Sequence, residues 1–334
     1  VANAQVLIDF SAQSFPDNSN IETQTDAQGR FTFKGKPLRL RGQTIQVSGP
    51  DQQMAHVRLP WQIIEDDPSL DKLRLQLKPP RRLILEVVDG DGKPLPGATT
   101  ALLANYRGWG SQQTDQTGKA TYLLPQDLEI QTIFAFSDGH GLDYRSYELS
   151  REQYGDQQAK RPEVPDHPIR LTLDGTQPLS IKVVDTTGKP LPGVEVAPWY
   201  LKKEGQPRDV NLSYFNNLIQ AETDQSGTVN FDWIPHWQQT PITMWPRGKG
   251  YAHLRTMYDP EKDKGKLTMR LQKLVPLSGK VSLPDGSPAA GIPISASGEG
   301  YMIDSFRGTT TTDDQGHYTI EAAPNMVYLV TAGN

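Results

Sequence analysis

The sequence predicts an all-β protein: a tandem array of Greek-key β-sandwiches of seven strands each, in which the first and last sandwiches are incomplete. Three observations support this prediction. A five-residue signature, Thr-Asp-x-x-Gly, occurs four times; a loop rich in proline and glycine precedes three of the copies; and no helical periodicity continues for more than about ten residues. The repeats therefore indicate an array of similar domains and not a single enzyme fold.

The four copies of the signature lie roughly one hundred residues apart. In each copy the aspartate carboxylate can accept hydrogen bonds from backbone N–H groups ahead of it, and the glycine can adopt the left-handed conformation of a bulged hairpin. We therefore expect each copy to be a turn between two strands. The expected structural turn residues are Asp26, Gly29, Asp115, Gly118, Asp224, Gly227, Asp313 and Gly316.

A second repeated segment precedes the signature. Residues 89–97 and 185–193 both begin with aspartate and end in Lys-Pro-Leu-Pro-Gly, and residues 283–291 are a looser copy. Glycine supplies a positive φ angle, while proline stiffens the chain and removes backbone donors. The segment therefore predicts a rigid loop between two strands.

The second repeat can be divided completely into strands. Leu83, Leu85 and Val87 alternate with other residues and should line one face of a sheet. Seven short antiparallel strands are expected, at residues 83–88, 98–104, 112–114, 119–124, 130–136, 142–148 and 168–173. The third repeat follows the same pattern and should close with a strand at 266–271.

These anchors divide the chain into four predicted domains, which we call repeats 1 to 4. Repeat 1 spans residues 1–79 and repeat 2 spans 80–177, while repeat 3 spans 178–274 with an aromatic-rich insertion at 199–221, and repeat 4 spans 275–334. Residues 1–4 align with the segment that follows the Pro-Gly loop, so repeat 1 is expected to be truncated at its N-terminal side and repeat 4 at its C-terminal side. Short junctions that contain proline favour a semi-rigid array.

Composition excludes several classes of function. The net charge of −5 comes from acids and bases scattered along the chain, and no basic stripe is present, which argues against a nucleic-acid partner. The chain has no cysteine, so thiol catalysis and thiolate metal sites are excluded. No apolar stretch is long enough to span a membrane, so we expect no membrane insertion by this segment.

The combination of the two repeated segments resembles the carboxypeptidase regulatory-like domain. The resemblance rests on a strand, Asp-x-x-Gly-Lys-Pro-Leu-Pro-Gly, a second strand, and then Thr-Asp-x-x-Gly with an aromatic strand. It implies a transthyretin-like, or prealbumin-like, β-sandwich of the broader immunoglobulin-like type. It covers nearly the whole chain, although repeat 4 has Ser287-Pro288-Ala289-Ala290-Gly291 in the loop and repeat 1 keeps only the signature.

The resemblance implies a non-catalytic accessory module of an exported bacterial protein. Tandem copies of such domains look like stalks or interaction modules at the cell envelope, periplasmic or extracellular and anchored through other regions. They also resemble the sensor ectodomains of membrane-anchored zinc metallopeptidases of the antibiotic-sensor type, in which the catalytic domain would lie outside this segment. The family's regulatory-like domain carries no peptidase residues, so none is transferred to this chain.

The residues themselves indicate no catalytic centre, no cofactor and no metal site. The six histidines include no His-Glu-x-x-His pair, and no Gly-x-Ser-x-Gly elbow is present. The Asp89-Gly90-Asp91-Gly92 loop is compatible with calcium, but the corresponding residues 185–188 lose one carboxylate and no bidentate glutamate follows. We interpret both loops as plain turns.

Aromatic residues of repeat 3 provide the functional hypothesis. Four of the six tryptophans lie in this repeat, which also has the longest excursion between its Pro-Gly loop and its signature. Exposed aromatic rings stack on sugars or pack against proteins, so the candidate ligand is a glycan or an envelope protein. The candidate binding residues are Trp199, Tyr200, Tyr214, Phe215 and Trp237. The alternative is that these side chains pack the insertion against its own sandwich, and we expect Trp233 and Trp245, on predicted strands, to be core or inter-domain residues.

Overall fold

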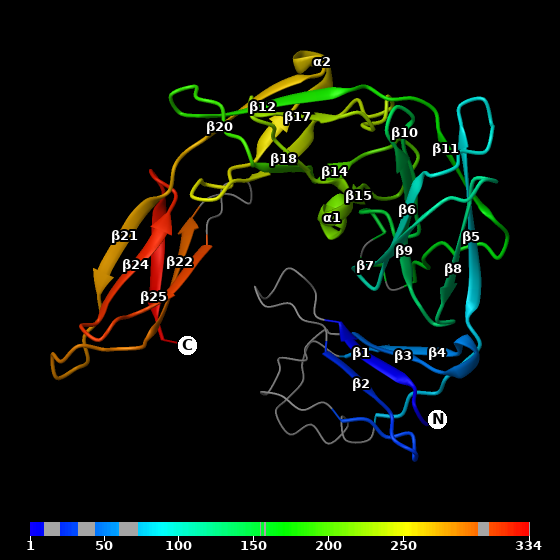
Figure 1. The fold of residues 1–334 in the computed structure, drawn as a ribbon, viewed down its shortest axis with the longest axis horizontal. Coiled ribbons are helices and arrows are strands. Elements are labelled where there is room, and N and C mark those ends of the chain that lie inside the picture. Colours follow the sequence, from blue (N-terminus) through cyan, green and yellow to red (C-terminus); the bar gives the residue numbers. More distant parts are fainter. Residues whose placement is uncertain are drawn as a thin grey trace. The chain divides into compact units, whose positions relative to one another are not determined.

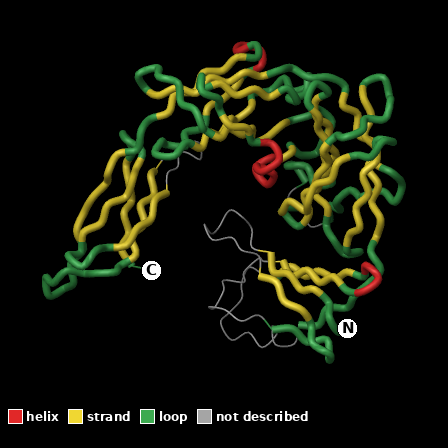
Figure 2. The backbone as a smooth tube through the Cα atoms, viewed as in Figure 1, coloured by secondary structure: helices red, strands yellow, loops and turns green. Residues whose placement is uncertain are grey.

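Nearly all of the regular structure consists of β-strands (Figure 2), which confirms the all-β prediction. The computed structural model describes residues 1–9, 21–32, 44–59, 73–153, 155–156, 158–299 and 307–333. The chain divides into two compact units, one formed by Val1–Ser137 with Asp143–Leu173 and the other by Asp138–Leu142 with Asp174–Asn334. The division into four domains stays a prediction, and repeats 1 to 4 are used below as names for their residue ranges.

Repeat 2, most of which lies in the first unit, is a two-layer sandwich with seven strands among its described residues (Figure 1). One sheet, in the order β11-β5-β8, contains β5 (Arg81–Asp89), β8 (Lys119–Leu124) and β11 (Ile169–Leu173). The other, in the order β10-β9-β6-β7, contains β6 (Thr99–Ala104), β7 (Arg107–Gln113), β9 (Ile130–Ser137) and β10 (Gly141–Ser146). Alternate residues of both sheets, such as Leu85, Val87 and Ile133, fill the core between them.

The expectation that all seven strands are antiparallel is wrong for the last one. β11 pairs with β5 in parallel, with Ile169 opposite Leu85 and Leu173 opposite Asp89. β11 returns to the first strand after a long connection rather than a hairpin, and a long connection is what a parallel neighbour requires.

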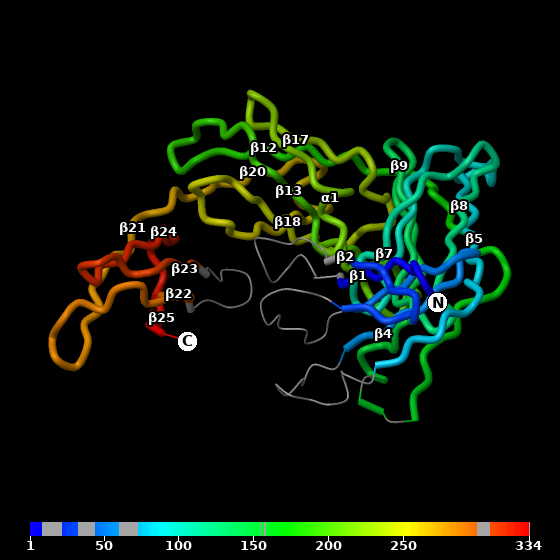
Figure 3. The backbone as a smooth tube through the Cα atoms, turned by 60° about the horizontal axis from the view of Figure 1, so that its bottom comes forward, coloured from blue at the N-terminus to red at the C-terminus, as the bar shows by residue number. Residues whose placement is uncertain are grey.

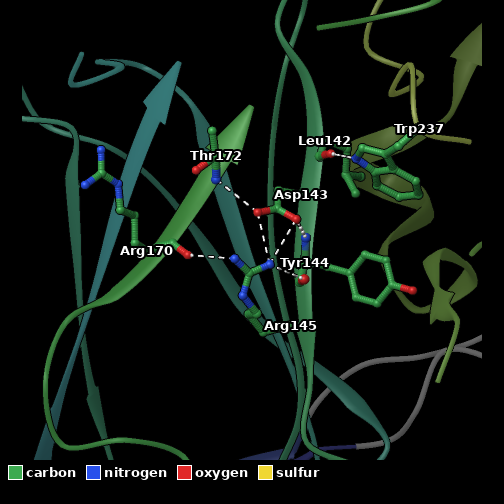
Figure 4. A network of polar contacts seen from close by, with 7 residues as sticks. All are labelled: Leu142, Asp143, Tyr144, Arg145, Arg170, Thr172 and Trp237. Carbon is green, nitrogen blue, oxygen red and sulfur yellow. Dashed lines mark hydrogen bonds and ion pairs between the residues drawn. The ribbon is translucent and has the colours of Figure 1, made fainter. Parts of the chain in front are cut away.

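A buried ion pair joins the two sheets of repeat 2 at one edge (Figure 4). Asp143, on β10, is fully buried, and its Oδ2 accepts a hydrogen bond from the Thr172 N–H on β11 at 3.0 Å. Arg145 Nη1 donates to both oxygens of this carboxylate at 3.1 Å, and Arg145 Nη2 donates to the Arg170 carbonyl at 3.3 Å. Because β10 and β11 belong to different sheets, these bonds close that edge of the sandwich.

Repeat 1, in the same unit, contains among its described residues a sheet that corresponds to one of these two. Its order, β2-β1-β3-β4, matches β7-β6-β9-β10 of repeat 2. The strands are β1 (Gln5–Asp9), β2 (Ile21–Gln24), β3 (Thr44–Ser48) and β4 (Met54–Arg58), with a 3₁₀ turn at Pro50–Gln52. Val6, Ile45 and Val47 lie in its core.

Repeat 3, in the second unit, repeats the two-sheet plan. One sheet, in the order β17-β12-β20, contains β12 (Leu179–Asp185), β17 (Thr228–Phe231) and β20 (Lys266–Leu271), and β20 again pairs in parallel with β12. The other, in the order β16-β13-β18-β19, contains β13 (Glu195–Pro198), β16 (Ala221–Glu222), β18 (Ile242–Arg247) and β19 (Thr256–Tyr258). A short helix, α2 (Pro260–Asp263), connects β19 to β20.

The insertion of repeat 3 has regular structure of its own. It contains a two-stranded hairpin, β14 (Tyr200–Leu201) with β15 (Val210–Asn211), then a 3₁₀ turn at Leu212–Phe215 and the helix α1 (Asn216–Ile219). Leu201, Val210, Leu212 and Ile219 are buried. The insertion therefore packs as an ordered part of the repeat.

Repeat 4 has five strands in two sheets, seen in orange to red in Figure 3. β21 (Val275–Lys280) pairs with β24 (His317–Ala322), and the second sheet has β22 (Pro293–Glu299) between β23 (Arg307–Thr311) and β25 (Val327–Ala332). These strands correspond in order and pairing to β5, β8, β6, β7 and β9 of repeat 2.

A buried threonine hydroxyl connects the signature turn to the Pro-Gly loop. In repeat 3, Thr223 Oγ1 donates to the Leu191 carbonyl at 2.7 Å and accepts from the Val194 N–H at 2.9 Å. Thr223 is 4% exposed. The same pair of bonds links Thr114 to Leu95 and Ala98, Thr312 to Ala289 and Ile292, and Thr25 to Val1 and Ala4. We call this two-bond contact the threonine clamp.

The clamp of repeat 1 corrects the expected alignment of the N-terminal residues. Val1 occupies the position of Leu95, and Asn3, whose N–H bonds to the Thr25 carbonyl, occupies that of Gly97. Asn3 has a φ angle of 56°, in the same left-handed region as Gly97. Residues 1–3 therefore correspond to the end of the loop, and only Ala4 corresponds to the segment after it. Asparagine can take the place of the loop glycine because it tolerates this conformation better than most residues do.

The aspartate of each signature closes its own turn. Asp224 Oδ1 accepts from the N–H groups of Ser226 and Thr228 at 2.8 and 2.9 Å. The Ser226 hydroxyl is the largest cause that lowers the pKa of this carboxyl, followed by the Thr228 N–H. Asp26, Asp115 and Asp313 accept the corresponding backbone bonds. The glycine at the end of each turn has a φ angle between 73° and 76°.

Removing the threonine hydroxyl should destabilise the repeat. We expect Thr223→Val to lower the free energy of unfolding by about 2 kcal/mol or more, because the Val194 N–H and Leu191 carbonyl lose a buried partner. The matched control is Thr268→Val, on the exposed side of β20. This substitution should change the free energy of unfolding by less than about 0.5 kcal/mol. Urea unfolding followed by tryptophan fluorescence measures both; equal effects of the two variants would contradict the role of the clamp.

Substitution of two glycines of repeat 3 distinguishes the cost of a strained backbone from the cost of a steric clash. Gly227 and Gly188 both have positive φ angles, 74° and 90°. A Cβ at Gly227 would lie 2.6 Å from the Val183 carbonyl oxygen, whereas one at Gly188 would meet nothing within 4 Å. We expect Gly188→Ala to cost about 1–2 kcal/mol of stability and Gly227→Ala to cost clearly more, as measured by thermal or urea unfolding. A Gly188→Ala variant as unstable as Gly227→Ala would show that crowding is unimportant.

Candidate functional site: an aromatic and arginine face on repeat 3

The outer face of the sheet β16-β13-β18-β19 carries aromatic and cationic side chains. Along β18, Ile242, Met244 and Pro246 are buried, while Thr243, Trp245 and Arg247 alternate with them and are only half-buried. Because successive side chains of a strand point to opposite faces, the second set lies on the outside of the sandwich. Met257, opposite Thr243 on β19, belongs to the same face and is 46% exposed.

Trp199 is held at the edge of this face by its backbone. Its N–H donates to the Thr243 carbonyl at 2.9 Å, and its carbonyl accepts from the Leu212 N–H at 2.8 Å. The Trp199 ring lies 5.9 Å from the Trp245 ring, centroid to centroid, and 4.8 Å from the Tyr200 ring. Ala197 stands opposite Trp245 in the register, and its small side chain leaves room for the indole.

Two arginines lie over these indoles. The Arg255 guanidinium carbon is 3.8 Å from the Trp199 ring centroid and 4.6 Å from that of Trp245. The Arg247 guanidinium carbon is 4.9 Å from the centroid of Trp245. Such contacts contribute about 0.5–1 kcal/mol each at exposed sites and more where water is excluded. We call Tyr200, Trp199, Arg255, Trp245 and Arg247 the aromatic–arginine stack.

Other charges lie at the Arg247 end of the stack. Glu195 is directly opposite Arg247 in the register, and Glu222 is opposite Glu195 on the neighbouring strand β16. Burial, the larger cause, and the positive charge of Arg247 both lower the pKa of His253 below 6.5, although a hydrogen bond with the Gly248 backbone opposes them. His253 is therefore neutral at pH 7.

The stack contains donors that the described residues do not satisfy. The indole Nε1 atoms of Trp199 and Trp245 are both buried, and neither has a hydrogen-bond partner among the described residues. A buried N–H without an acceptor costs about 1–3 kcal/mol. These two indole N–H groups therefore lack the acceptor that a buried donor normally has.

The structure separates the five predicted binding residues. Trp199 and Tyr200 lie together in the stack, and Tyr200 is 38% exposed. Phe215 is 3% exposed, so its ring is not available as a surface platform. Tyr214, in the same 3₁₀ turn, is half-buried. For Phe215 the interpretation as packing of the insertion fits the burial better than a binding role does.

Trp237 takes part in a different set of contacts. Its indole N–H donates to the Leu142 carbonyl at 3.0 Å (Figure 4), and both residues belong to the second unit. The Lys203 ammonium lies 5.6 Å from the centroid of its ring. The hydrogen bond fixes the indole in place.

Sequence reasoning missed three members of the face. Trp233 and Trp245 were both expected in the core or between domains: Trp233 is 5% exposed and packs edge-on against Phe231, whereas Trp245 is half-buried on the outer face of its sheet. The alternation of Trp245 and Arg247 with the apolar residues of β18 was a signal for the outer face. Nothing in the local sequence indicates Arg255, because it reaches the indoles from the position just before a different strand, β19.

The turn carboxylates have ordinary structural partners. Asp89 Oδ1 accepts from the N–H groups of Asp91 and Lys93, and Asp185 Oδ1 accepts from those of Thr187 and Lys189. Among the residues that the structure describes, no three histidine, aspartate or glutamate side chains gather closely enough to hold a metal ion. Within the same described ranges, none of the helices has the length and apolar character needed to cross a membrane.

Comparisons with known proteins find likeness only among solved structures. No family model and no curated protein matches the chain. The shaft pilin SpaA from Lactobacillus rhamnosus GG aligns with 58% of this chain and 98% of its own, at 13% identity and a TM-score of 0.22. A streptococcal ancillary pilin aligns with 76% of this chain and 96% of its own, at 12% identity and a TM-score of 0.26. The Bacillus anthracis TIE protein aligns with 100% of this chain and 63% of its own, at 13% identity and a TM-score of 0.22. TM-scores this low carry no conclusion about this chain.

The charge of Arg247 should be measurable at His253. We expect Arg247→Ala to raise the pKa of His253, because a positive neighbour that disfavours the imidazolium is removed. The pKa should stay below 6.5, since burial is the larger cause. An NMR titration of the imidazole C–H signals measures the change, and Arg270→Ala, on β20 of the other sheet, is the control. An unchanged or lower pKa of His253 would contradict the arrangement.

Proposed function

We propose that the chain is a non-catalytic repeat array that acts as a stalk and interaction module of an exported cell-envelope protein. The observation that carries this proposal is the threonine clamp, which recurs in all four repeats with the same atoms and the same two bonds. The repeats share the contacts that maintain the fold, whereas their surface residues differ from copy to copy. This pattern is typical of a domain that serves as a spacer and not of one that carries an active site.

The carboxylates with lowered pKa values agree with this proposal. Perturbed pKa values often mark catalytic groups, but structural hydrogen bonds also produce them. Here the hydroxyl of the residue two positions ahead is the largest cause for Asp115, Asp185, Asp224 and Asp285. Each shift is therefore explained by the closure of a turn, without any role in catalysis.

A replacement experiment in the source cell tests the stalk role. Residues 80–177 are exchanged for an unrelated β-sandwich of similar length, with an epitope placed in an exposed loop. We expect the protein to remain at the envelope, with the epitope accessible to antibody on intact or outer-membrane-permeabilised cells. The cellular function of the full-length protein should also persist. Deletion of the same residues shortens the array and should impair the cellular function of the full-length protein.

Two outcomes would overturn the stalk role. One is a cytoplasmic location of the epitope-carrying protein. The other is a robust hydrolytic activity of the purified chain against peptide or glycoside substrates that a single substitution abolishes.

Carbohydrate binding through repeat 3 is a second candidate function, favoured by the aromatic–arginine stack. Of the candidate residues, Trp199 and Tyr200 are brought together there, and Tyr200 keeps an exposed ring. Aromatic side chains that combine an apolar face with a polar tip are suited to contacts at partly hydrated surfaces. We expect affinity electrophoresis through gels that contain polysaccharide to retard the chain, and the Trp199→Ala, Trp245→Ala double variant to lose the retardation.

Trp109→Phe, in repeat 2, is the control for that experiment. Retardation that survives in the double variant would show that the site lies elsewhere. The alternative of a sensor ectodomain for a membrane-anchored zinc metallopeptidase is tested separately, by the presence of a His-Glu-x-x-His helix among membrane spans in the gene that encodes this segment.

A further inference from the structure

Repeat 4 carries a large share of the exposed apolar surface. Four of its large apolar side chains are exposed, namely Val275, Leu283, Val327 and Leu329, whereas the described parts of the three longer repeats together expose four others. Exposed apolar side chains that lie together mark an interaction site more often than single ones do. Val327 and Leu329, at 71% and 58% exposure, lie two positions apart on β25, so this strand is the part of repeat 4 best suited to an interaction.

β25 lies at an edge of its sheet. Its order is β23-β22-β25, so β22 pairs with β25 on one side, and no described strand pairs with it on the other. In repeats 2 and 3 the equivalent strands, β9 and β18, each have a further strand on that side, β10 and β19. The same side of β25 is therefore a position at which this kind of sandwich accepts one more strand.

The backbone of β25 is oriented for such pairing. The Gly333 N–H donates to the Pro293 carbonyl, so these two residues form a directly bonded pair across β22 and β25. Directly bonded pairs recur at every second residue of an antiparallel ladder, which assigns Thr331 and Leu329 to the bonds with β22. The N–H and C=O groups of Val330 and Ala332 therefore point away from β22, toward the edge.

β25 lacks the features that normally keep edge strands apart. Its sequence, Val-Tyr-Leu-Val-Thr-Ala, contains no charged residue and no proline. Each of the other described edge strands with five or more residues contains a lysine, arginine, aspartate or glutamate. Such charges oppose pairing with another chain. Among the described edge strands of this length, β25 is thus the one open to it.

The uncharged sequence favours a second copy of this chain as the partner. In a dimer with two-fold symmetry the same patch of both copies meets, and two identical strands pair in antiparallel orientation. Any charged side chain on the strand would then lie close to its own like charge, which is unfavourable. β25 can pair with itself without that cost.

The core of repeat 4 would gain cover from the same contact. Its fully buried members are few, Ile294, Ala296 and Ile320, and the half-buried Tyr328 and Val330 of β25 pack against them. A second copy beside β25 would shield these half-buried side chains from water. Burial of apolar surface contributes roughly 25 cal/mol per Å².

Symmetry limits the register of the pairing. Two registers keep the inner faces aligned and pair five residues of each strand. One places Leu329 opposite Leu329 of the second copy and Val327 opposite Thr331, and the other leaves Val327 outside the ladder. Because the first covers both exposed side chains, it is the register that we expect.

We propose that β25 is a self-association surface, at which two copies of this chain pair in antiparallel orientation about a two-fold axis centred on Leu329. The pairing joins two sheets of the form β23-β22-β25 into one sheet. It gives the proposed interaction module a defined partner, and it does not depend on the proposed binding of a glycan.

Sedimentation velocity of the purified chain over a range of concentrations tests the association. We expect a reversible equilibrium between monomer and dimer. Leu329→Lys places two like charges opposite each other and should raise the Kd of the dimer by about tenfold or more. The matched control is Leu283→Lys, because Leu283 is 47% exposed in a loop of the same repeat and lies outside the strand. This control should leave the Kd unchanged.

A disulfide tests the register without depending on the lysine variant. The chain has no cysteine, so a single introduced thiol can react only with that of a second copy. Leu329 would face itself in a pair that is not directly bonded, with Cα atoms about 4.5 Å apart, which suits a disulfide. Leu329→Cys should therefore form a covalent dimer under mild oxidation, whereas Leu283→Cys should remain monomeric.

Three outcomes would overturn the proposal. The first is a chain that stays monomeric at the highest soluble concentration, with Leu329→Cys no faster to cross-link than Leu283→Cys. The second is a dimer that Leu329→Lys does not weaken, since its interface would lie elsewhere. The third is a monomer that binds a synthetic peptide with the sequence of β10, which would show that the edge takes a strand from a source other than a second copy.

Discussion

A single buried hydroxyl on the signature threonine connects the two loops that define each repeat. Thr114, Thr223 and Thr312 donate to a carbonyl of the Pro-Gly loop and accept from the N–H of the residue that follows its glycine. Thr25 makes the same two bonds. The adjacent turn glycine fits there because it has no Cβ, and the turn aspartate closes the turn. The sandwich depends on this contact because it ties the loop between the first two strands to the turn that leads from one sheet into the other, as from β7 to β8 in repeat 2.

The clamp also explains how the repeats can differ in surface without losing their fold. Repeat 2 closes one edge with the buried Asp143–Arg145 pair, while repeat 3 uses the hydroxyl of Tyr258, which accepts from the Gly265 N–H. In repeat 3 the insertion and the outer sheet bring aromatic rings and two arginines together as the stack. In the proposed functions, different residues therefore maintain the fold and bind a ligand. The threonine clamp stabilises each repeat, and the aromatic–arginine stack of repeat 3 binds the ligand.

Most of the fold could be predicted because its signals are local. Spacing of turn residues and alternation of apolar residues placed six strands of repeat 2 within two positions of those observed, whereas β7 begins at Arg107 and not at residue 112 as expected. The parallel pairing of β11 with β5 was missed, because pairing between distant strands leaves no local pattern. For the same reason the sequence indicated Trp199 and Tyr200 but not Arg255, which meets them only in the folded chain. Trp245 was expected in the core or between domains, because hydrophobicity alone does not tell which face of a strand is buried.

Native-state hydrogen exchange of two amide protons tests the clamp most directly. The Val194 N–H donates to the buried Thr223 hydroxyl, and the Ala98 N–H donates in the same way to Thr114. If the clamp holds each sandwich closed, both protons should exchange only through unfolding of the whole repeat, as slowly as amides in the centres of β12 and β5. Exchange at rates typical of surface loops would show that the clamp opens independently and would contradict its central role.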